Sequence, residues 1–203
     1  PYDTPTNIGI KWQMDVKYVP KNCYSGNDGE KFYQYTIIDE ASRERFIYPY
    51  KEQSSYSTID FVKRAIVYFG YKPKIIQTDN GLEFTNNREK SDKSLHLFDE
   101  LCKELNIEHK LIRPRTPRHN GKVERSHRND QERFYSFLSF FSLDDLNIQM
   151  KAYLKRSNNI PSSSINWMTP IEKRESLINT KHSNKSLFPI FEKTIFNSIV
   201  SHY

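Results

Sequence analysis

Three extended segments come before the first helical segment of the chain, and this order limits the possible folds most. Residues 10–19 alternate between apolar and polar side chains, while residues 32–38 and 45–50 are rich in aromatic and β-branched side chains. All three are therefore predicted strands. The turn sequence at 25–29 predicts that the first two strands form a hairpin. Asp15 is expected on the polar face of the first strand.

The rest of the chain alternates between helical and extended patterns. Apolar side chains recur at helical spacing between Ser57, a candidate cap, and Phe69, and Gly70 is a typical end signal. The predicted helices cover 57–69, 95–105, 121–141, about 144–154 and 170–175, and the predicted strands cover 74–78 and 107–112. This order predicts an α/β fold, in which a mixed five-stranded sheet is flanked by helices.

The helix predicted over 121–141 carries apolar side chains at every third or fourth position, which indicates one buried seam. The expected seam residues are Val123, His127, Phe134, Phe137, Leu138 and Phe141. His127 is therefore expected to be a packed core histidine rather than a catalytic base.

The excess positive charge of the chain is concentrated in one short segment. The sequence has a formal charge of +6, and seven cations with a single acid, Glu124, lie between Lys110 and Arg128. Such a segment on an otherwise neutral chain is typical of a polyanion-binding site, although a solvated basic loop and helix face explains it equally well. The acid inside this run predicts either an ion pair or a metal ligand beside a phosphate site.

Composition argues against several other classes of protein. No apolar run approaches the roughly 18 residues that a membrane span needs. Cys23 and Cys102 have no nearby cysteine that would suggest a disulfide framework or a zinc site. We therefore expect a chain that works in a reducing intracellular compartment, away from membranes.

Three carboxylates occupy positions that an α/β sheet can bring together. Asp15 lies in the first strand, Asp79 follows the strand 74–78, and Glu124 lies in the first turn of a helix. Functional groups collect beyond the carboxyl ends of strands in such sheets, and clustered carboxylates repel one another unless cations neutralise them. Mg²⁺ or Mn²⁺ suits this need, because hard cations prefer oxygen ligands. Two ions about 3.5–4 Å apart would clamp a phosphodiester.

Each acid also has a simpler explanation when it is taken alone. Asp79 begins an Asp-Asn-Gly turn. Glu124 is favoured by the positive end of a helix, and Asp15 suits the surface of a strand. The metal-site hypothesis therefore depends on the longer motifs around these acids.

Those longer motifs resemble one family. They are Trp12-Gln13-Met14-Asp15, the segment 77–84 (QTDNGLEF) and the segment 113–128 (RPRTPRHNGKVERSHR). Together they look like the catalytic core of the retroviral-integrase superfamily, and most like that of bacterial insertion-sequence transposases. The third segment is the most specific, and residues 167–172 (WMTPIE) resemble the close of the same domain.

The resemblance implies a ribonuclease-H-like fold and a DDE triad of Asp15, Asp79 and Glu124 that holds two Mg²⁺ or Mn²⁺ ions. The DNA-binding residues expected from the basic segment are Arg115, Arg118, Lys122, Arg125 and Arg128, and the auxiliary residues are Asn80, Glu83, Asn120 and Gly121. Two departures stand out. Lys17 stands where the family often has threonine, and the 44 residues between Asp79 and Glu124 form a longer interval than usual, with the polar segment 86–94 as a surface insertion.

The implied function is that of a transposase or integrase catalytic domain, a DDE polynucleotidyl transferase. It would cleave DNA at element ends and transfer the 3′-OH into target DNA, as an oligomer in a bacterial cytoplasm, with no small-molecule substrate besides water. Two alternatives stay open, namely a catalytically silent DNA-binding or assembly module derived from a transposon and a simple ribonuclease-H-type nuclease. A leader at 1–9, the catalytic core at 10–175 and a tail of unknown role at 176–203 are expected, with element ends recognised by a separate N-terminal part.

Overall fold

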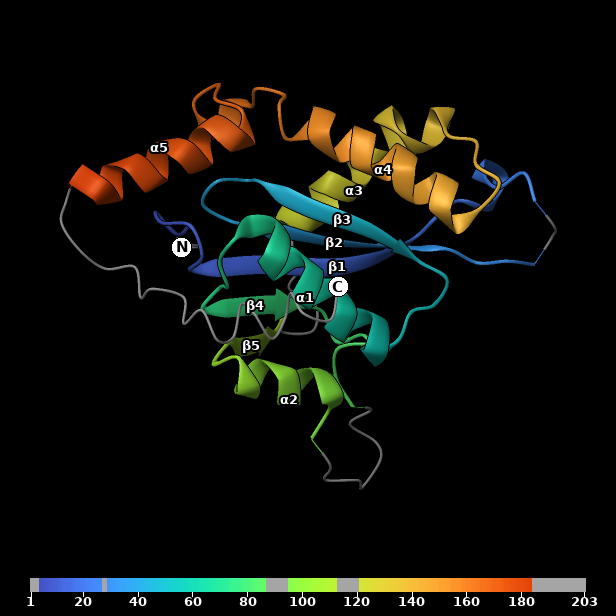
Figure 1. Cartoon of the computed structure of the whole chain (residues 1–203), viewed down its shortest axis with the longest axis horizontal. Coiled ribbons are helices and arrows are strands. Elements are labelled where there is room, and N and C mark those ends of the chain that lie inside the picture. Colours follow the sequence, from blue (N-terminus) through green and yellow to red (C-terminus); the bar gives the residue numbers. More distant parts are fainter. Residues whose placement is uncertain (1–3, 27–28, 87–94, 113–120, 184–203) are drawn as a thin grey trace.

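One mixed sheet of five strands organises the protein (Figure 1). The computed structural model describes residues 4–26, 29–86, 95–112 and 121–183, with side chains up to Thr180. The strands are β1 (Lys11–Tyr18), β2 (Tyr33–Asp39), β3 (Arg45–Tyr50), β4 (Ile75–Thr78) and β5 (Glu108–Leu111). Their order is β3-β2-β1-β4-β5, with β1–β3 antiparallel and β4 and β5 parallel to β1. The predicted mixed five-stranded sheet is confirmed.

Helices cover both faces of this sheet. The α-helices are α1 (Ser55–Phe69), α2 (Leu97–Glu104), α3 (Gly121–Arg133), α4 (Leu143–Ser157) and α5 (Pro170–Ser183). Short 3₁₀ turns are η1 (Lys21–Cys23), η3 (Tyr135–Phe137) and η4 (Ser163–Ile165). In Figure 1, α1 crosses in front of the strands and α3 lies behind them. None of the described helices is long and apolar enough to span a bilayer.

The alternation of side chains along β1 places two different kinds of residue on the two faces. Trp12 and Met14 are fully buried in the core formed with α1 and α2. Gln13 points to the opposite face, yet it is only 1% exposed, because α3 covers that face. The polar face of the strand is therefore an internal surface, and its polar side chains need partners from α3.

The helix that was predicted to continue to Phe141 ends at Arg133, so the prediction of its buried seam was wrong in part. The chain beyond η3 becomes extended, and Phe140 exchanges backbone hydrogen bonds with Cys23 and Ser25. These bonds replace the helical ones and break the helical period. Phe137 and Phe141, both expected in the core, are 84% and 71% exposed. Val123, Phe134 and Leu138 are buried as predicted.

Other helix boundaries differ by short stretches. Helix α1 is capped by the Ser54 side chain, which accepts from the backbone N–H of Ser57, so the cap lies three residues before the predicted one. Gly70 ends this helix in the left-handed conformation (φ 72°), as the sequence indicated. Helix α5 runs on to Ser183 and so crosses the boundary at 175/176. The division into leader, core and tail stays a prediction.

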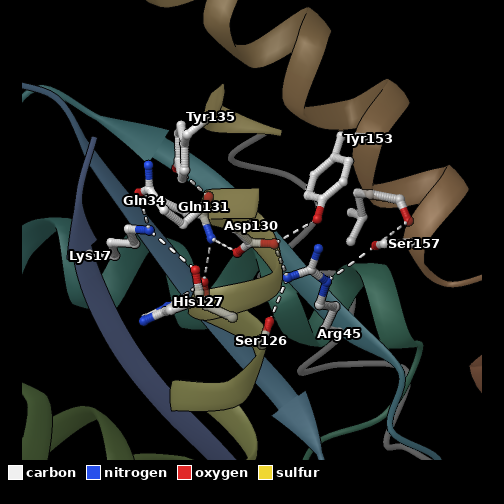
Figure 2. Close-up of polar contacts among 12 residues, drawn as sticks. Lys17, Gln34, Arg45, Ser126, His127, Asp130, Gln131, Tyr135, Tyr153 and Ser157 are labelled. Atoms are coloured by element: carbon white, nitrogen blue, oxygen red, sulfur yellow. Dashed lines mark hydrogen bonds and ion pairs between the residues drawn. The ribbon is translucent and has the colours of Figure 1, made fainter. Parts of the chain in front are cut away.

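A buried ion pair joins α3 to the sheet and to α4 (Figure 2). The Asp130 carboxylate of α3 is fully buried and accepts hydrogen bonds from Arg45 Nη1 (2.7 Å) on β3, Gln34 Nε2 (2.7 Å) on β2 and Tyr153 OH (2.9 Å) on α4. Arg45 also donates to the hydroxyls of Ser126 and Ser157. Four elements therefore converge on a single carboxylate.

Asp130→Asn should destabilise the protein strongly. The substitution leaves the buried Arg45 guanidinium without its counter-charge, which costs about 3–5 kcal/mol and lowers the melting temperature by roughly 6–20 °C in a chain of this size. Asp144→Asn, an exposed acid in the first turn of α4, is the matched control and should change the melting temperature very little. Equal melting temperatures for both variants would show that the ion pair does not anchor α3.

Candidate active site

The first two acids of the candidate triad lie on neighbouring parallel strands. Gln13 of β1 is paired with Gln77 of β4. Asp15 and Asp79 each follow this pair by two residues along the chain. The register therefore brings them to the same level, at the carboxyl end of β4. Asp79 is the first residue after β4, where the chain leaves the sheet. The parallel pairing is therefore what brings together two residues separated by 63 others.

Asp15 experiences a strongly negative environment. Burial first, and then the negative charges of Asp79, Glu83 and Glu124, together raise the pKa of Asp15 to about 7, against a backbone hydrogen bond from Val16 that lowers it. These neighbours come from the loop after β4 and from the first turn of α3. The fold thus brings Asp79 and Glu124 into electrostatic range of Asp15, together with a fourth carboxylate, Glu83.

The four carboxylates lack a cationic partner among the described residues. None of them forms an ion pair with a described lysine or arginine, and the His127 ring is the only described basic side chain within 4 Å of Asp15. Oxygen donors with uncompensated negative charge fit a hard divalent cation. The arrangement is open, however, because no three His, Cys, Asp or Glu side chains in the described part of the chain are grouped closely enough to hold a metal ion by themselves.

The turn that carries Asp79 is held by its own side chains. Asp79 Oδ1 accepts from the backbone N–H of Gly81 (3.0 Å), and Asn80 Nδ2 donates to the carbonyl of Ile112 (3.1 Å), just beyond β5. A Cβ atom on Gly81 would lie 2.6 Å from both carboxylate oxygens of Glu83. Asn80 and Gly81 therefore act on the site by positioning the loop.

Glu83 is more closely integrated into the site than its place in the sequence suggests. Its side chain is buried, with 7% exposure, and Oε1 accepts a hydrogen bond of 2.6 Å from Gln53 Nε2. The carboxylate folds back over the Gly81 backbone toward the acid cluster. The structure thus places this predicted auxiliary acid within electrostatic range of Asp15, whereas its chemical role stays a prediction.

A side chain of β1 caps the start of helix α3, which carries Glu124. Gln13 Oε1 accepts from the backbone N–H groups of Lys122 (3.1 Å) and Val123 (3.3 Å), two donors that have no partner within the helix. Gln13 Nε2 in turn donates to the fully buried Glu40 (2.7 Å). Sequence reasoning missed this role, although Gln13 lies in the quoted motif, because a cap supplied from a distant strand has no local signature.

Glu40 is held by two lysines as well as by Gln13. Its carboxylate forms ion pairs with Lys11 (3.3 Å) and Lys122 (2.8 Å). Lys122, which was expected to contact DNA, is thus largely occupied within the protein, and burial lowers its pKa. Its main role in this structure is to fasten the start of α3 to the β2–β3 turn.

His127 contacts Asp15, so the prediction that it belongs only to the packed core was incomplete. Its Nδ1 lies 3.4 Å from Asp15 Oδ2, and its Nε2 lies 3.1 Å from Thr36 Oγ1 on β2. Burial lowers the pKa of His127 to about 4, so the ring is neutral at physiological pH. A neutral ring orients Asp15 without cancelling its charge.

Lys17, the departure from the family pattern, ties β1 to α3. Its Nζ donates to the carbonyl of His127 (3.2 Å) and to Gln131 Oε1 (3.0 Å), and it lies 4.8 Å from the centroid of the Tyr135 ring (Figure 2). Burial lowers the pKa of this ammonium. The lysine therefore reinforces the packing of the helix that carries Glu124, and it lies outside the acid cluster.

The remaining predicted DNA contacts divide into three groups. Arg128 is exposed one turn beyond Glu124, on the same face of α3. Arg125 is exposed on a different face of the helix. Arg115 and Arg118 lie outside the described residues. Of the predicted auxiliary residues, Asn120 also lies outside the described residues, and Gly121 is the first residue of α3.

Comparison with known proteins agrees with this geometry. Two sequence patterns, both described as the integrase core domain, match residues 6–117 and 105–170. An integrase, ORF3 of Spiroplasma virus SpV1-C74, is 33% identical over 173 residues, which are 81% of this chain and 47% of the viral protein. The retrovirus-related Pol polyprotein from transposon TNT 1-94 of Nicotiana tabacum is 32% identical over 117 residues, 57% of this chain and 8% of the polyprotein. The chain thus spans about half or less of the length of these relatives.

Solved structures share the fold at lower identity. The HTLV-2 integrase catalytic core, determined with magnesium in a dimeric form, has a TM-score of 0.61 at 24% identity and covers 83% of this chain and 97% of its own. The catalytic core of BIV integrase has a TM-score of 0.61 at 21% identity, with coverage of 86% and 99%. The specific likeness to bacterial insertion-sequence transposases stays a prediction. The fold is ribonuclease-H-like, and the chain belongs to the integrase core domain family.

Proposed function

We propose that this chain is the catalytic domain of a divalent-metal-dependent polynucleotidyl transferase that cleaves DNA at element ends and joins the 3′-OH to a target phosphodiester. Asp15, Asp79 and Glu124 are the catalytic acids. The observation that carries the proposal is the gathering of carboxylates from three elements around Asp15, without a described lysine or arginine paired with them; together with burial, these carboxylates raise the pKa of Asp15 to about 7. A purely structural role offers no reason for such an arrangement, because it costs stability.

Mg²⁺ or Mn²⁺ is the proposed cofactor, and Asp15, Asp79 and Glu124 are the residues that would hold two ions. When bound, the ions would neutralise charge on the phosphodiester and activate the attacking water or 3′-OH. Asp15 is the acid whose pKa the other three carboxylates raise, so it is the proposed central ligand of the site. That the HTLV-2 catalytic core was solved with magnesium supports this choice of metal.

The protein's own contribution is to position these acids. Gln13 holds the start of α3, and hence Glu124, beside β1, while His127 and the Val16 amide hold the Asp15 carboxylate. Arg128, exposed beside Glu124, is the proposed contact to the DNA phosphates at the site. A related structure, an intasome of simian T-cell lymphotropic virus, supports assembly of such domains on DNA as oligomers.

Asp79→Asn should abolish strand cleavage and joining while DNA binding persists. Loss of a metal ligand is expected to lower the joining rate by about 10³-fold, since metal-ion catalysis contributes several kcal/mol to the transition state. The measurement is joining of a labelled 3′-OH oligonucleotide with Mg²⁺, with Asp144→Asn as the matched control. Undiminished joining by Asp79→Asn rejects the assignment. If the parent chain cleaves DNA but does not join it, the protein is a simple nuclease. If the parent chain does neither, it is a silent module.

Magnesium should stabilise the folded chain, and more at pH 8 than at pH 6. At a concentration 100 times its dissociation constant, Mg²⁺ contributes about 2.7 kcal/mol, or roughly 5–11 °C in melting temperature. Because the pKa of Asp15 is about 7, protons compete for this ligand at pH 6. Melting curves with Mg²⁺ and with a chelator test this, and Asp15→Asn should lose the shift.

Asp15→Asn also gives an independent check of the raised Asp15 pKa, in melting curves recorded with the chelator. A raised carboxyl pKa means that ionisation costs stability as the pH rises from about 4 to 7, so Asp15→Asn should melt above the parent at pH 8. A lower melting temperature for the variant, or an unchanged magnesium shift, would contradict the proposed site.

Gln13→Met should slow joining without weakening DNA binding. The substitution removes the acceptor for the first amides of α3, and a displacement of Glu124 by about 1 Å can lower the rate by about 100-fold. Steady-state kinetics well below the melting temperature should show a lower kcat with KM for DNA unchanged. Gln149→Met on α4 serves as the control, and equal kcat values for the two variants would remove Gln13 from the positioning residues.

A further inference from the structure

A pocket of about 540 Å³ lies on the side of α3 that faces away from Asp15. Its walls come from the outward face of α3, the β2–β3 turn, the end of α4 and the segment 160–167. Within α3, the pocket residues include Arg125, Asn129 and Arg133. These are spaced four apart and so form one stripe, which lies about 120° around the helix from the stripe of Glu124 and Arg128. We refer to this cavity as the α3 rear pocket.

The rear pocket is basic. None of the described residues that line it is acidic, whereas five are lysine or arginine. Two of these cations are compensated from outside the pocket, Arg45 by Asp130 and Lys122 by Glu40. Arg125 and Arg133 are exposed and form no ion pair with any described carboxylate. The pocket therefore has a net positive charge that suits an anionic ligand.

The volume of the rear pocket and the length of its arginine stripe suit a ligand larger than a single small anion. Arg125 and Arg133 are eight positions apart in α3, and at 1.5 Å per residue they are separated by roughly 12 Å along the axis. The stripe is therefore long enough to contact more than one phosphate of an extended, unpaired strand. The cavity has the volume of a small-ligand site, typically about 300–1,000 Å³, which admits one or two nucleotides but no duplex.

An exposed indole lies at the edge of the same pocket. Trp167 lines the pocket and is 73% exposed. Both Asn166 and Trp167 have left-handed backbone conformations, with φ of 58° and 61°, and the Trp167 N–H donates to the Ser162 carbonyl (2.9 Å). Such conformations cost of order 1–3 kcal/mol for residues other than glycine. The turn therefore holds a large aromatic surface in solvent beside the arginines, where burying it would be the usual outcome.

Arginines beside a solvent-exposed aromatic ring are the combination that binds unpaired nucleotides, through phosphate contacts and base stacking. We propose that the α3 rear pocket binds a single-stranded DNA segment, with its phosphates on Arg125 and Arg133 and one base on Trp167. The inference extends the proposed function, since α3 would then contact DNA on two faces. One face carries Glu124 and the chemistry, and the other holds an unpaired strand.

The test is binding of a fluorescently labelled hexamer of thymidylate to the full chain, in chelator and in the Asp79→Asn background. The fluorescence anisotropy of the labelled hexamer gives the affinity, and quenching of tryptophan emission reports contact between a base and Trp167. Trp12 is fully buried, so quenching of the exposed Trp167 should dominate the signal. Because neither metal nor chemistry is needed, failure here leaves the joining assay unaffected, and failure of joining leaves this binding intact.

Two substitutions and one matched control decide the outcome. Trp167→Ala should weaken binding at least about fivefold, since stacking of one base contributes about 1–3 kcal/mol. Arg133→Ala should weaken it severalfold and reduce the slope of log affinity against log salt by about 0.7. Lys103→Ala, an exposed lysine on α2, should leave both unchanged.

The opposite results are equally informative. Unchanged affinity in both Trp167→Ala and Arg133→Ala would overturn the proposal, because the oligonucleotide would then bind elsewhere. Competition by thymidine monophosphate at the same concentration as the hexamer would overturn the assignment to DNA and favour a mononucleotide site. Melting temperatures of the variants close to that of the parent confirm that these exposed substitutions leave the fold intact.

Discussion

The packing of α3 against the polar side of β1 and β2 is the constraint on which the rest of the structure depends. Apolar contacts alone would allow a helix to slide or rotate on a sheet, whereas a buried polar network is satisfied in few arrangements. Here Asp130 accepts hydrogen bonds from Arg45, Gln34 and Tyr153, and Gln13 accepts them from the first backbone amides of the helix. Because these contacts lie near both ends of α3, its position along the sheet and its rotation are both determined.

Once α3 is held in this way, each of its faces has a separate task. One face carries Glu124 toward Asp15, a second places His127 and Asp130 against the sheet, and a third presents Arg125 and the neighbouring basic residues to solvent. An ionised Asp15 is unfavourable here, because burial and the neighbouring carboxylates raise its pKa. Stability is therefore supplied by the buried network and the two apolar cores, while the site retains the uncompensated charge that a cation would use.

Much of the candidate site could be predicted from sequence. The succession of strands and helices along the chain, the turn after β4 and the elements that carry Asp15, Asp79 and Glu124 are local features, or features of short motifs, and they agree with the structure. The roles of Gln13 and Glu40 as supports for α3 were missed, as was the pairing of Lys122 with Glu40, while the assignment of Lys122 to DNA stays a prediction. These omissions share one cause, since each partner lies more than 25 residues away along the chain.

By itself, the sequence determined which segments form strands and helices and which acids could meet, because side-chain period, caps and turns act over a few residues. Only the tertiary structure decided that the polar face of β1 is internal, that α3 ends at Arg133, and which charges are compensated. The physical reason is that hydrogen bonds and burial between distant segments compete with local preference. At Phe140, for example, backbone hydrogen bonds with Cys23 and Ser25 take the place of the last two turns of the helix that was predicted to reach Phe141.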